Sequence, residues 1–361
     1  MTTIRPARAA AREKAERARP VRLVVDGGQT MLRMGVLDED GDTPRLREQV
    51  SVPGFQWTAG DDPVEQQCRR VVEAWDSLGR PAPVGVVALG LAGGASDPDS
   101  RRRLAPLVAE RTAAERVLLT GDDVTTHLGV LGGAPGVVVA AGTGVACLAV
   151  TEAGELINVD GLGYLFGDAG GGFSLGLAGL RAALAGFEGR GPETALTARA
   201  ERRVGRPLRD AVKRWYRSPS LVADVAGFAA EVAQAAGPPD DDPVARRLSL
   251  RAGEDLAVSV TAAVRKGFSG SRDGSVPVSW AGGVLGADVI FEAFSRGLTQ
   301  LCPAAVLRDP IGDSLAGALR LAAGNAVPHL ASVVVHTRPA GAGLGAGPGG
   351  SGGSSGSPAA S

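Results

Sequence analysis

Two short segments of the sequence each combine an apolar run with glycines and a threonine at its end. Arg22–Thr30 reads Arg-Leu-Val-Val-Asp-Gly-Gly-Gln-Thr, and Gly136–Gly144 reads Gly-Val-Val-Val-Ala-Ala-Gly-Thr-Gly. Glycines let the backbone N–H groups of a turn approach a ligand closely, and a threonine hydroxyl adds a donor. Each segment therefore predicts a strand ending in a turn that suits the oxygens of a phosphate chain. For the first segment alone an ordinary hairpin turn is an equal alternative, because Asp-Gly is the commonest hairpin signal.

The residues after the two turns also correspond. A second apolar run follows each turn, and a glycine lies eleven residues after each threonine, at Gly41 after Thr30 and at Gly154 after Thr143. Internal repeats indicate architecture more directly than any single motif does. We therefore predict a duplicated domain in which each half contributes one hairpin, so that two facing hairpins can hold a triphosphate from both sides.

Acidic residues occur where such a fold would place a substrate. Asp122 and Asp123 follow the predicted strand Arg116–Thr120 and precede a helix predicted to begin at Val124. Ligands gather at the carboxyl ends of strands in open α/β sheets. One of the two acids is expected to cap the helix, and the other is then available to the cleft.

The segment Asp160–Gly176 is unusually rich in glycine. It holds seven glycines and two acids around Tyr164, Leu165 and Phe166. Such glycine density predicts a backbone wrapped closely around a small polar ligand, with Asp168 in its middle. A flexible linker is the alternative, but linkers rarely carry three large apolar side chains.

Aromatic residues follow the third predicted strand, in Val50–Trp57. A Pro-Gly pair there precedes Phe55 and Trp57. These rings can border a substrate, although a capped turn with aromatic packing explains the same residues.

Composition limits the classes of partner. The 361 residues include 38 basic and 39 acidic ones, for a formal charge of -1, which argues against nucleic acid as the main partner. The three cysteines are scattered and only three histidines occur, which disfavours disulfide, zinc and iron–sulfur sites and fits a reducing cytosol. The longest apolar run, Val137–Val150, is interrupted by Gly-Thr-Gly and is too short to span a bilayer. We therefore expect a cytoplasmic protein without a membrane segment.

Chain length predicts two lobes, because roughly 310 residues remain for folding once the two ends are set aside, enough for two domains. Helices are expected after Asp62 and Asp97, each followed by proline, and after the acidic loop 238–243. The last helix, opened by Asp309–Gly317, is expected to close the second lobe. The predicted divisions are a frayed extension at 1–20, an N-terminal lobe at 21–133, a C-terminal lobe at 134–328 and a disordered Gly/Ser/Ala/Pro tail at 329–361.

Five short motifs, taken in order, resemble the N-acetylglucosamine kinase branch of the BadF/BadG/BcrA/BcrD ATPase family, in the sugar kinase, Hsp70 and actin superfamily. They are Asp-Gly-Gly-x-Thr at 26–30, Gly-Asp-Asp at 121–123, Gly-Thr-Gly at 142–144, Gly-Asp-x-Gly at 167–170 and Ala-Gly-Gly-Val at 281–284. The resemblance covers about residues 21–325. It implies an α/β fold with two lobes, a duplicated ribonuclease H-like (actin-like ATPase) architecture with a central cleft.

The resemblance also implies residue roles. The positions that match the two phosphate loops and the adenosine loop are Gly27, Gly28, Thr30, Gly142, Thr143, Gly144, Gly282 and Gly283. Asp26 matches the carboxylate that faces hydrated Mg²⁺, and Asp122 matches the acid at the sugar hydroxyl, where it serves as catalytic base. The positions that match the sugar-binding segment are Gly163 and Asp168.

Several positions depart from the family pattern. Gln29 stands where Gly is frequent, Leu162 replaces Trp, Ala169 replaces Glu, and Val145-Ala146 replaces Ser-Asn. The nucleotide assignment survives these changes, whereas the identity of the sugar is left open.

These observations predict an ATP-dependent kinase, using ATP and Mg²⁺, that acts on the 6-hydroxyl of N-acetylglucosamine or a related small-molecule amino sugar. The alternatives are a kinase for glucosamine or another sugar, a BadF-type activator ATPase, and a sugar sensor without catalysis. The scattered cysteines disfavour the activator, and the retained Asp26 and Asp122 disfavour the sensor. The sequence leaves open whether the chain forms a homodimer.

Overall fold

The computed structural model describes residues 20–38, 45–55, 60–81, 83–93, 97–205, 207–218, 220–269, 275–324 and 332–339. The predictions for the extension at 1–19, for Gly41, for Trp57 and for the tail beyond 339 lie outside these residues. In the described parts of the chain, no helix has the length and apolar character needed to cross a membrane.

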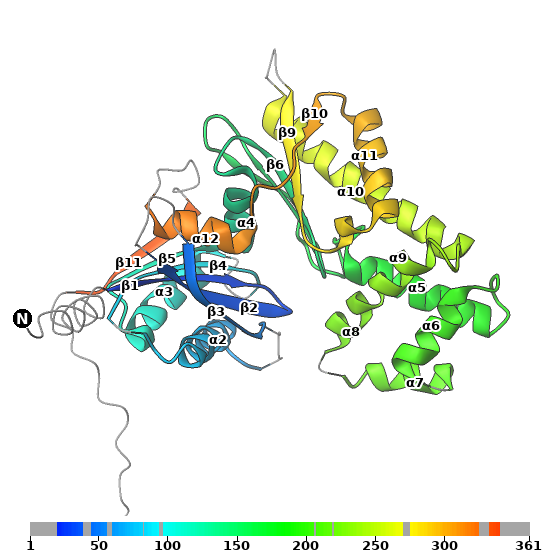
Figure 1. The fold of residues 1–361 in the computed structure, drawn as a ribbon, viewed down its shortest axis with the longest axis horizontal. Helices are drawn as coiled ribbons and strands as arrows, with labels where there is room; N and C mark the ends of the chain where they lie inside the picture. The colour runs from blue at the N-terminus through cyan, green and yellow to red at the C-terminus, as the bar shows by residue number, and fades with distance from the viewer. Residues whose placement is uncertain are drawn as a thin grey trace, which may run out of the picture.

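The first lobe is built on a six-stranded sheet in the order β11-β5-β4-β1-β2-β3 (Figure 1). Its first strands form an antiparallel meander, and the next two lie parallel to β1. Their bounds are β1 Val21–Gly27, β2 Met31–Asp38, β3 Arg45–Pro53, β4 Val84–Leu91 and β5 Arg116–Gly121.

The second lobe repeats this arrangement in a five-stranded sheet, in the order β10-β9-β6-β7-β8. The meander β6, β7 and β8 corresponds to β1, β2 and β3, and β9 lies parallel to β6 as β4 does to β1. The bounds are β6 Gly136–Ala141, β7 Val145–Val150, β8 Leu156–Asp160, β9 Val276–Ala281 and β10 Ala305–Leu307. The matching strand orders confirm the predicted duplicated, two-lobed α/β fold of the actin-like ATPase type.

The helices cover the faces of these sheets. The bounds are α2 Pro63–Ser77, α3 Pro98–Thr112, α4 Asp122–Leu131, α5 Gly172–Phe187, α6 Ala195–Val204, α7 Leu208–Trp215, α8 Leu221–Gly227, α9 Ala229–Ala235, α10 Pro243–Phe268, η1 Val284–Gly286, α11 Asp288–Leu301 and α12 Ser314–Ala322. Asp62, Asp97 and Asp242 accept backbone N–H groups at the starts of α2, α3 and α10, where proline occupies the first turn. These caps confirm the helix starts predicted from Asp-Pro pairs.

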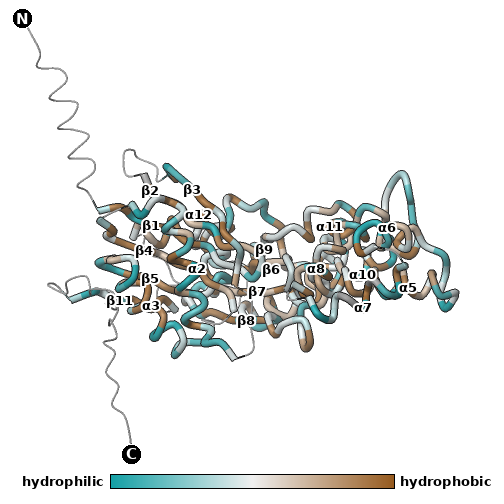
Figure 2. The backbone as a smooth tube through the Cα atoms, turned by 90° about the horizontal axis from the view of Figure 1, so that it is seen from below, coloured by the Kyte–Doolittle hydropathy of each residue, from teal (hydrophilic) through white to brown (hydrophobic). Residues whose placement is uncertain are grey.

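The central strands of each sheet are buried between apolar side chains, whereas the edge strand β3 is mostly exposed. In the first lobe α2 and α3 pack on one face of the sheet, through Val71, Leu104 and Val108, and α12 packs on the other (Figure 1). In the second lobe the core lies among β6, β7, β9, α5, α10 and α11. The strand β4 is buried almost throughout, and Figure 2 shows brown, hydrophobic stretches within both lobes.

Two predicted boundaries are wrong. The helix α12 does not close the second lobe, because Leu315 and Ala318 pack against Val24 and Ala88 of the first sheet. The strand β11, Val334–Thr337, lies within the predicted disordered tail and pairs antiparallel with β5. The first sheet therefore draws its last helix and its edge strand from the end of the described chain, which apolar periodicity alone does not assign to a lobe.

The helices α4 and α12 cross at very close range between the lobes. A Cβ atom added to Gly317 would lie 1.7 Å from the carbonyl oxygen of Thr125, and one added to Gly129 would lie 1.7 Å from that of Asp313. The other side of α4 packs on the second sheet, where Leu128 contacts Leu148 and Val150. This helix pair therefore determines how the two sheets face each other.

We expect Gly317→Val to destabilise the fold, because the helices must separate to admit the side chain. Overpacking of this kind costs about 1–3 kcal/mol or more, and thermal and denaturant unfolding measure it. Gly286→Ala is the matched control, since a Cβ there meets nothing within 4 Å. Equal stability of the two variants would contradict the close crossing.

Candidate active site

A cleft with a volume of about 590 Å³ lies between the two sheets. Most of the residues singled out in the sequence line it, although they come from both halves of the chain. These are Asp26, Gly28, Thr30, Asp122, Gly142, Thr143, Gly144, Gly163, Asp168 and Gly282. The duplicated fold thus brings both Gly/Thr turns, the acidic pair and the glycine-rich segment to one cavity.

The two hairpin turns meet across the cleft. The hydroxyl oxygens of Thr30 and Thr143 lie 3.1 Å apart and share a hydrogen bond. Each turn is closed by a backbone bond, from Gly28 N–H to Met31 O and from Gly142 N–H to Gly144 O. A Cβ added at Gly142 would meet nothing within 4 Å, so this turn borders open space. Two hydroxyls and the adjacent turn backbones therefore converge at one point.

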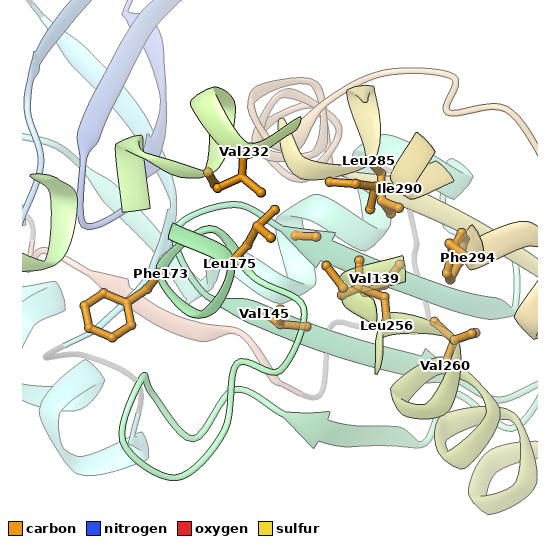
Figure 3. Close-up of a cluster of buried hydrophobic side chains, with 14 of the residues drawn as sticks. Val139, Val145, Phe173, Leu175, Val232, Leu256, Val260, Leu285, Ile290 and Phe294 are labelled. Atoms are coloured by element: carbon orange, nitrogen blue, oxygen red, sulfur yellow. The ribbon is translucent and has the colours of Figure 1, made fainter. Parts of the chain in front are cut away.

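A second cavity, of about 860 Å³, adjoins this point on the side of the second lobe. Its walls come from α8 and α9 on one side and from η1 and the start of α11 on the other, and alanine, glycine and valine predominate. Gly283 lines this cavity, while the preceding Gly282 lines the cleft. Ile290 lines this cavity as well, and together with Val232 and Leu285 it belongs to the core of the second lobe (Figure 3).

Asp122 is the most strongly perturbed acid in the cleft. Burial, followed by the nearby charges of Asp123 and Asp26, raises the pKa of its carboxyl to about 7. The backbone N–H groups at the start of α4 oppose this shift. A carboxylate whose pKa lies near neutrality is suited to accept a proton from a hydroxyl group.

Asp123, by contrast, is held by neighbours on both oxygens. Its Oδ1 accepts the N–H of Val124, and its Oδ2 accepts the Nδ2 of Asn158 on β8, each at 2.9 Å. The expectation that one of the two acids caps the helix is wrong: α4 begins at Asp122, two residues before the predicted start, and its N-cap residue is Gly121, with no side-chain capping bond. Asn158 was missed by the sequence reasoning; its only signal is a polar residue inside a short apolar strand.

Arg33 is a second cleft residue that the sequence did not identify. Its Nε and Nη2 donate to Oδ2 of Asp26 at 3.0 and 2.6 Å, and its Nη1 donates to Oδ2 of Asp313 at 2.6 Å. Nη2 also donates to the hydroxyl of Ser314 at 3.1 Å. Arg33 lines the cleft, so a cation lies beside the first Gly/Thr turn and joins Asp26 to the start of α12. A single arginine within the apolar run Met31–Leu37 is the signal that identifies it.

Asp168 supports the second loop from behind. Its Oδ1 accepts the N–H of Val145 at 3.0 Å, and its own N–H donates to Oδ1 of Asp160 at 2.7 Å. Both aspartates adopt left-handed backbone conformations, at φ 63, which Asp tolerates better than most residues. This structural role was not predicted from the sequence. The role of Asp168 toward a sugar stays a prediction.

Gly27 is not among the residues that line the cleft, although the resemblance matches it to a phosphate loop. It lies at the buried end of β1, and a Cβ there would come 2.6 Å from the Leu91 side chain. Its carbonyl accepts the N–H of Ala92 at 2.8 Å. Its lack of a side chain therefore serves strand packing, and Gly28 is the first-turn glycine that lines the cleft.

The family model for BadF/BadG/BcrA/BcrD ATPases matches residues 10–322. The chain belongs to this family. Among curated proteins, an N-acetylmuramic acid/N-acetylglucosamine kinase of Clostridium acetobutylicum is 27% identical over 189 residues, which are 52% of this chain. The chain spans 60% of the length of that relative.

Solved structures share the architecture of this BadF-family chain. A candidate N-acetylglucosamine kinase from Chromobacterium violaceum is 27% identical, with a TM-score of 0.64 over 84% of this chain and 99% of that one. A ROK family glucokinase from Streptomyces griseus, in complex with glucose and AMPPNP, is 18% identical, with a TM-score of 0.52 over 84% of this chain and 100% of that one. At 18% identity, the likeness to the glucokinase shows only that the two chains share a fold.

The cleft of this BadF-family protein fits a Mg²⁺ ion that is shared with phosphates. In the described residues, no group of three or more His, Cys, Asp or Glu side chains is gathered to hold a metal by itself. Asp26 and Asp122 are close enough for the charge of one to raise the pKa of the other. Mg²⁺ commonly binds through one or two carboxylates together with substrate phosphates, and Asp26, beside the first loop, is the residue that would hold it.

We expect the Arg33–Asp313 pair to contribute more stability than an ordinary surface ion pair. A double-mutant cycle with Arg33→Met and Asp313→Asn should give a coupling energy on the order of 0.5–3 kcal/mol. The matched control is Arg102–Asp99, whose side chains are 64% and 85% exposed, and there the coupling should be about 0.2–1 kcal/mol or less. Denaturant unfolding measures both cycles. Equal coupling would contradict a structural role for the Arg33 bridge.

Proposed function

We propose that the protein is an ATP-dependent sugar kinase that phosphorylates the 6-hydroxyl of N-acetylglucosamine or a related amino sugar. The observation that carries this proposal is the arrangement in the cleft: Asp122 lines the cavity into which both Gly/Thr turns project. On the far side of the turns lies a larger cavity suited to a nucleoside. In this proposal the sugar lies beside Asp122, the reacting phosphate lies between the two turns, and the nucleoside lies in the larger cavity.

The names of the relatives agree with this proposal. The curated relative is named a kinase of N-acetylmuramic acid and N-acetylglucosamine, and the Chromobacterium protein a candidate N-acetylglucosamine kinase. Membership of an ATPase family supports ATP as the phosphate donor. Because the reaction consumes ATP, the proposal includes a cytoplasmic location.

In the proposed reaction, different residues bind the phosphates and accept the proton of the sugar hydroxyl. Backbone N–H groups of the two turns, with the hydroxyls of Thr30 and Thr143, bind the oxygens of the phosphate chain. Asp122 orients the sugar hydroxyl and takes its proton as that oxygen forms a bond to the γ-phosphorus and the bond from phosphorus to the ADP oxygen breaks. When bound, Mg²⁺ neutralises charge on the phosphates. Positioning and charge neutralisation account for most of the catalysis in such reactions.

We expect Asp122→Asn to lower kcat by on the order of 10²–10⁴, because the variant cannot accept the sugar proton. ATP binding, measured by calorimetry, should be retained. Asp123→Asn is the matched control: its amide oxygen can still accept the Val124 N–H, so kcat should stay within a few fold of the wild-type value. Steady-state assays with N-acetylglucosamine compare the two. The reverse pattern would transfer the base from Asp122 to Asp123.

The raised pKa of Asp122 predicts a pH dependence. The base must be deprotonated, so kcat/KM should rise about tenfold per pH unit below pH 7 and level off above the pKa of about 7. The same shift acts on stability, because between the ordinary pKa of 3.8 and about 7 the folded state holds a proton that the unfolded state releases. The wild-type protein should therefore lose stability relative to Asp122→Asn as the pH rises from 4 to 8. Melting temperatures of both proteins across this range check the sign, and a constant difference would contradict it.

A further inference from the structure

A buried glutamine lies close to the first Gly/Thr turn. Gln67 stands on α2, three residues after Val64 and four before Val71, so it belongs to the buried face of that helix. The residue is 3% exposed. An amide buried this deeply is costly unless its polar atoms are paired, so the partners of Gln67 indicate what it does.

The amide nitrogen of Gln67 holds the end of β4 against the turn. Its Nε2 donates to the carbonyl of Ala92 at 2.7 Å. The N–H of Ala92 in turn donates to the carbonyl of Gly27 at 2.8 Å. Ala92 also lines the cleft. Gln67 is therefore two hydrogen bonds away from the backbone of the first turn, without reaching the cleft itself.

The amide oxygen of Gln67 is unpaired. The carbonyl of Ala92 can only accept, so the amide atom that faces it must be the nitrogen, and the orientation of the amide is fixed. Oε1 is then a buried acceptor to which none of the described residues donates. Leaving such an oxygen without a donor generally costs more free energy than immobilising one water molecule beside it.

A small cavity, of about 10 Å³, lies beside this amide. Gln67, Gly27 and Gly28 line it together with Arg70, whose Nη1 donates to Glu73 at 2.6 Å and whose other guanidinium N–H groups are further donors. The apolar part of the lining consists of Leu32, Phe55 and Leu91. The cavity is about the size of one water molecule, and it offers that molecule both acceptors and a donor.

We propose that this cavity binds a single structural water molecule, and that Gln67 and the water position the first Gly/Thr turn. The water donates to Oε1 and to a turn carbonyl, and it accepts from Arg70. The carbonyls of Gly27 and Gly28 each accept one backbone N–H, from Ala92 and Phe55, and each keeps a second lone pair.

The function of such a site follows from the residues that it supports. Glycine backbones are conformationally permissive, so a turn built on Gly27 and Gly28 gains a defined shape from the groups packed around it. A fully satisfied buried polar network supplies that rigidity. Gln67 touches no ligand in this arrangement and is a positioning residue. The inference rests on the proposed function for one point only, that the turn holds the phosphate chain.

The water molecule is tested directly by a high-resolution crystal structure of the protein. We expect one peak of solvent density about 2.7–3.2 Å from Oε1 of Gln67, with a second contact to Arg70 or to the turn. A cavity without ordered solvent, or one filled by a neighbouring side chain, overturns the site. This readout is independent of any enzymatic activity.

Gln67→Met tests the positioning role, because methionine has a similar size and lacks the amide donor and acceptor. We expect the dissociation constant of MgATP to rise about fivefold and that of N-acetylglucosamine to stay within about twofold, since only the phosphate turn loses its support. Calorimetry measures both constants. The matched control is Gln66→Met, the same change one residue earlier on α2, where the side chain bonds Asp61 at the surface and both constants should stay as in the wild type. A lower melting temperature of Gln67→Met with unchanged affinities overturns the positioning role.

A second pair of variants keeps the test decisive if Gln67→Met does not fold. Arg70→Met removes the donor from the cavity and should also weaken MgATP binding, by about two- to fivefold. Glu73→Gln breaks the ion pair of Arg70 while leaving its guanidinium in place, and it should bind MgATP as the wild type does. Equal affinities of these two variants overturn the role of Arg70 at the water. Absence of MgATP binding and of sugar phosphorylation in the wild type overturns the proposed function instead, and the solvent density then decides the water site alone.

Discussion

The close crossing of α4 and α12 is the constraint on which the rest of the structure depends. Gly129 and Gly317 let each helix backbone approach the other more closely than any side chain would allow. One side of this pair packs on the first sheet and the other on the second. The relative position of the two sheets follows from it, and so does the meeting of Thr30 and Thr143 across the cleft.

Charge is distributed unevenly around that meeting point. Asp26, Asp122 and Asp123 lie together at the carboxyl ends of β1 and β5, where burial, followed by the charges of Asp123 and Asp26, raises the pKa of Asp122. Arg33 neutralises Asp26, and Asn158 and an amide of α4 occupy Asp123. Among the described residues, Asp122 is therefore the acid of the three whose side chain has no arginine or asparagine partner. Enzyme active sites commonly contain one ionisable group whose pKa is shifted in this way by burial and by neighbouring charges.

The two Gly/Thr turns also position the segments packed against them. Each loop accepts a backbone N–H from the segment that carries an aromatic ring, Phe55 for the first loop and Phe173 for the second. Asp168 fastens the second loop through Val145. Any ligand bound between the loops therefore meets walls whose geometry depends on the loops themselves.

Local patterns in the sequence were sufficient for much of the fold. The repeat of an apolar run with a Gly/Thr turn predicted the duplication, and Asp-Pro pairs predicted the starts of α2 and α3, because these signals act within a few residues. The acidic pair at 122–123 and the turns at 28–30 and 142–144 were placed at the cleft for the same reason. The glycine motifs did not distinguish Gly27, which serves packing, from Gly28, which lines the cleft.

The sequence by itself determined which residues could bind phosphate and which acids stood at strand ends, since residue type and spacing set those local properties. Only the tertiary structure decided that α12 and β11 belong to the first lobe, that Arg33 bridges Asp26 and Asp313, and that Asp123 is engaged while Asp122 is left for the cleft. These features join residues far apart in the chain. Burial, electrostatic repulsion and packing between such residues exist only after the lobes have come together, so no local pattern encodes them.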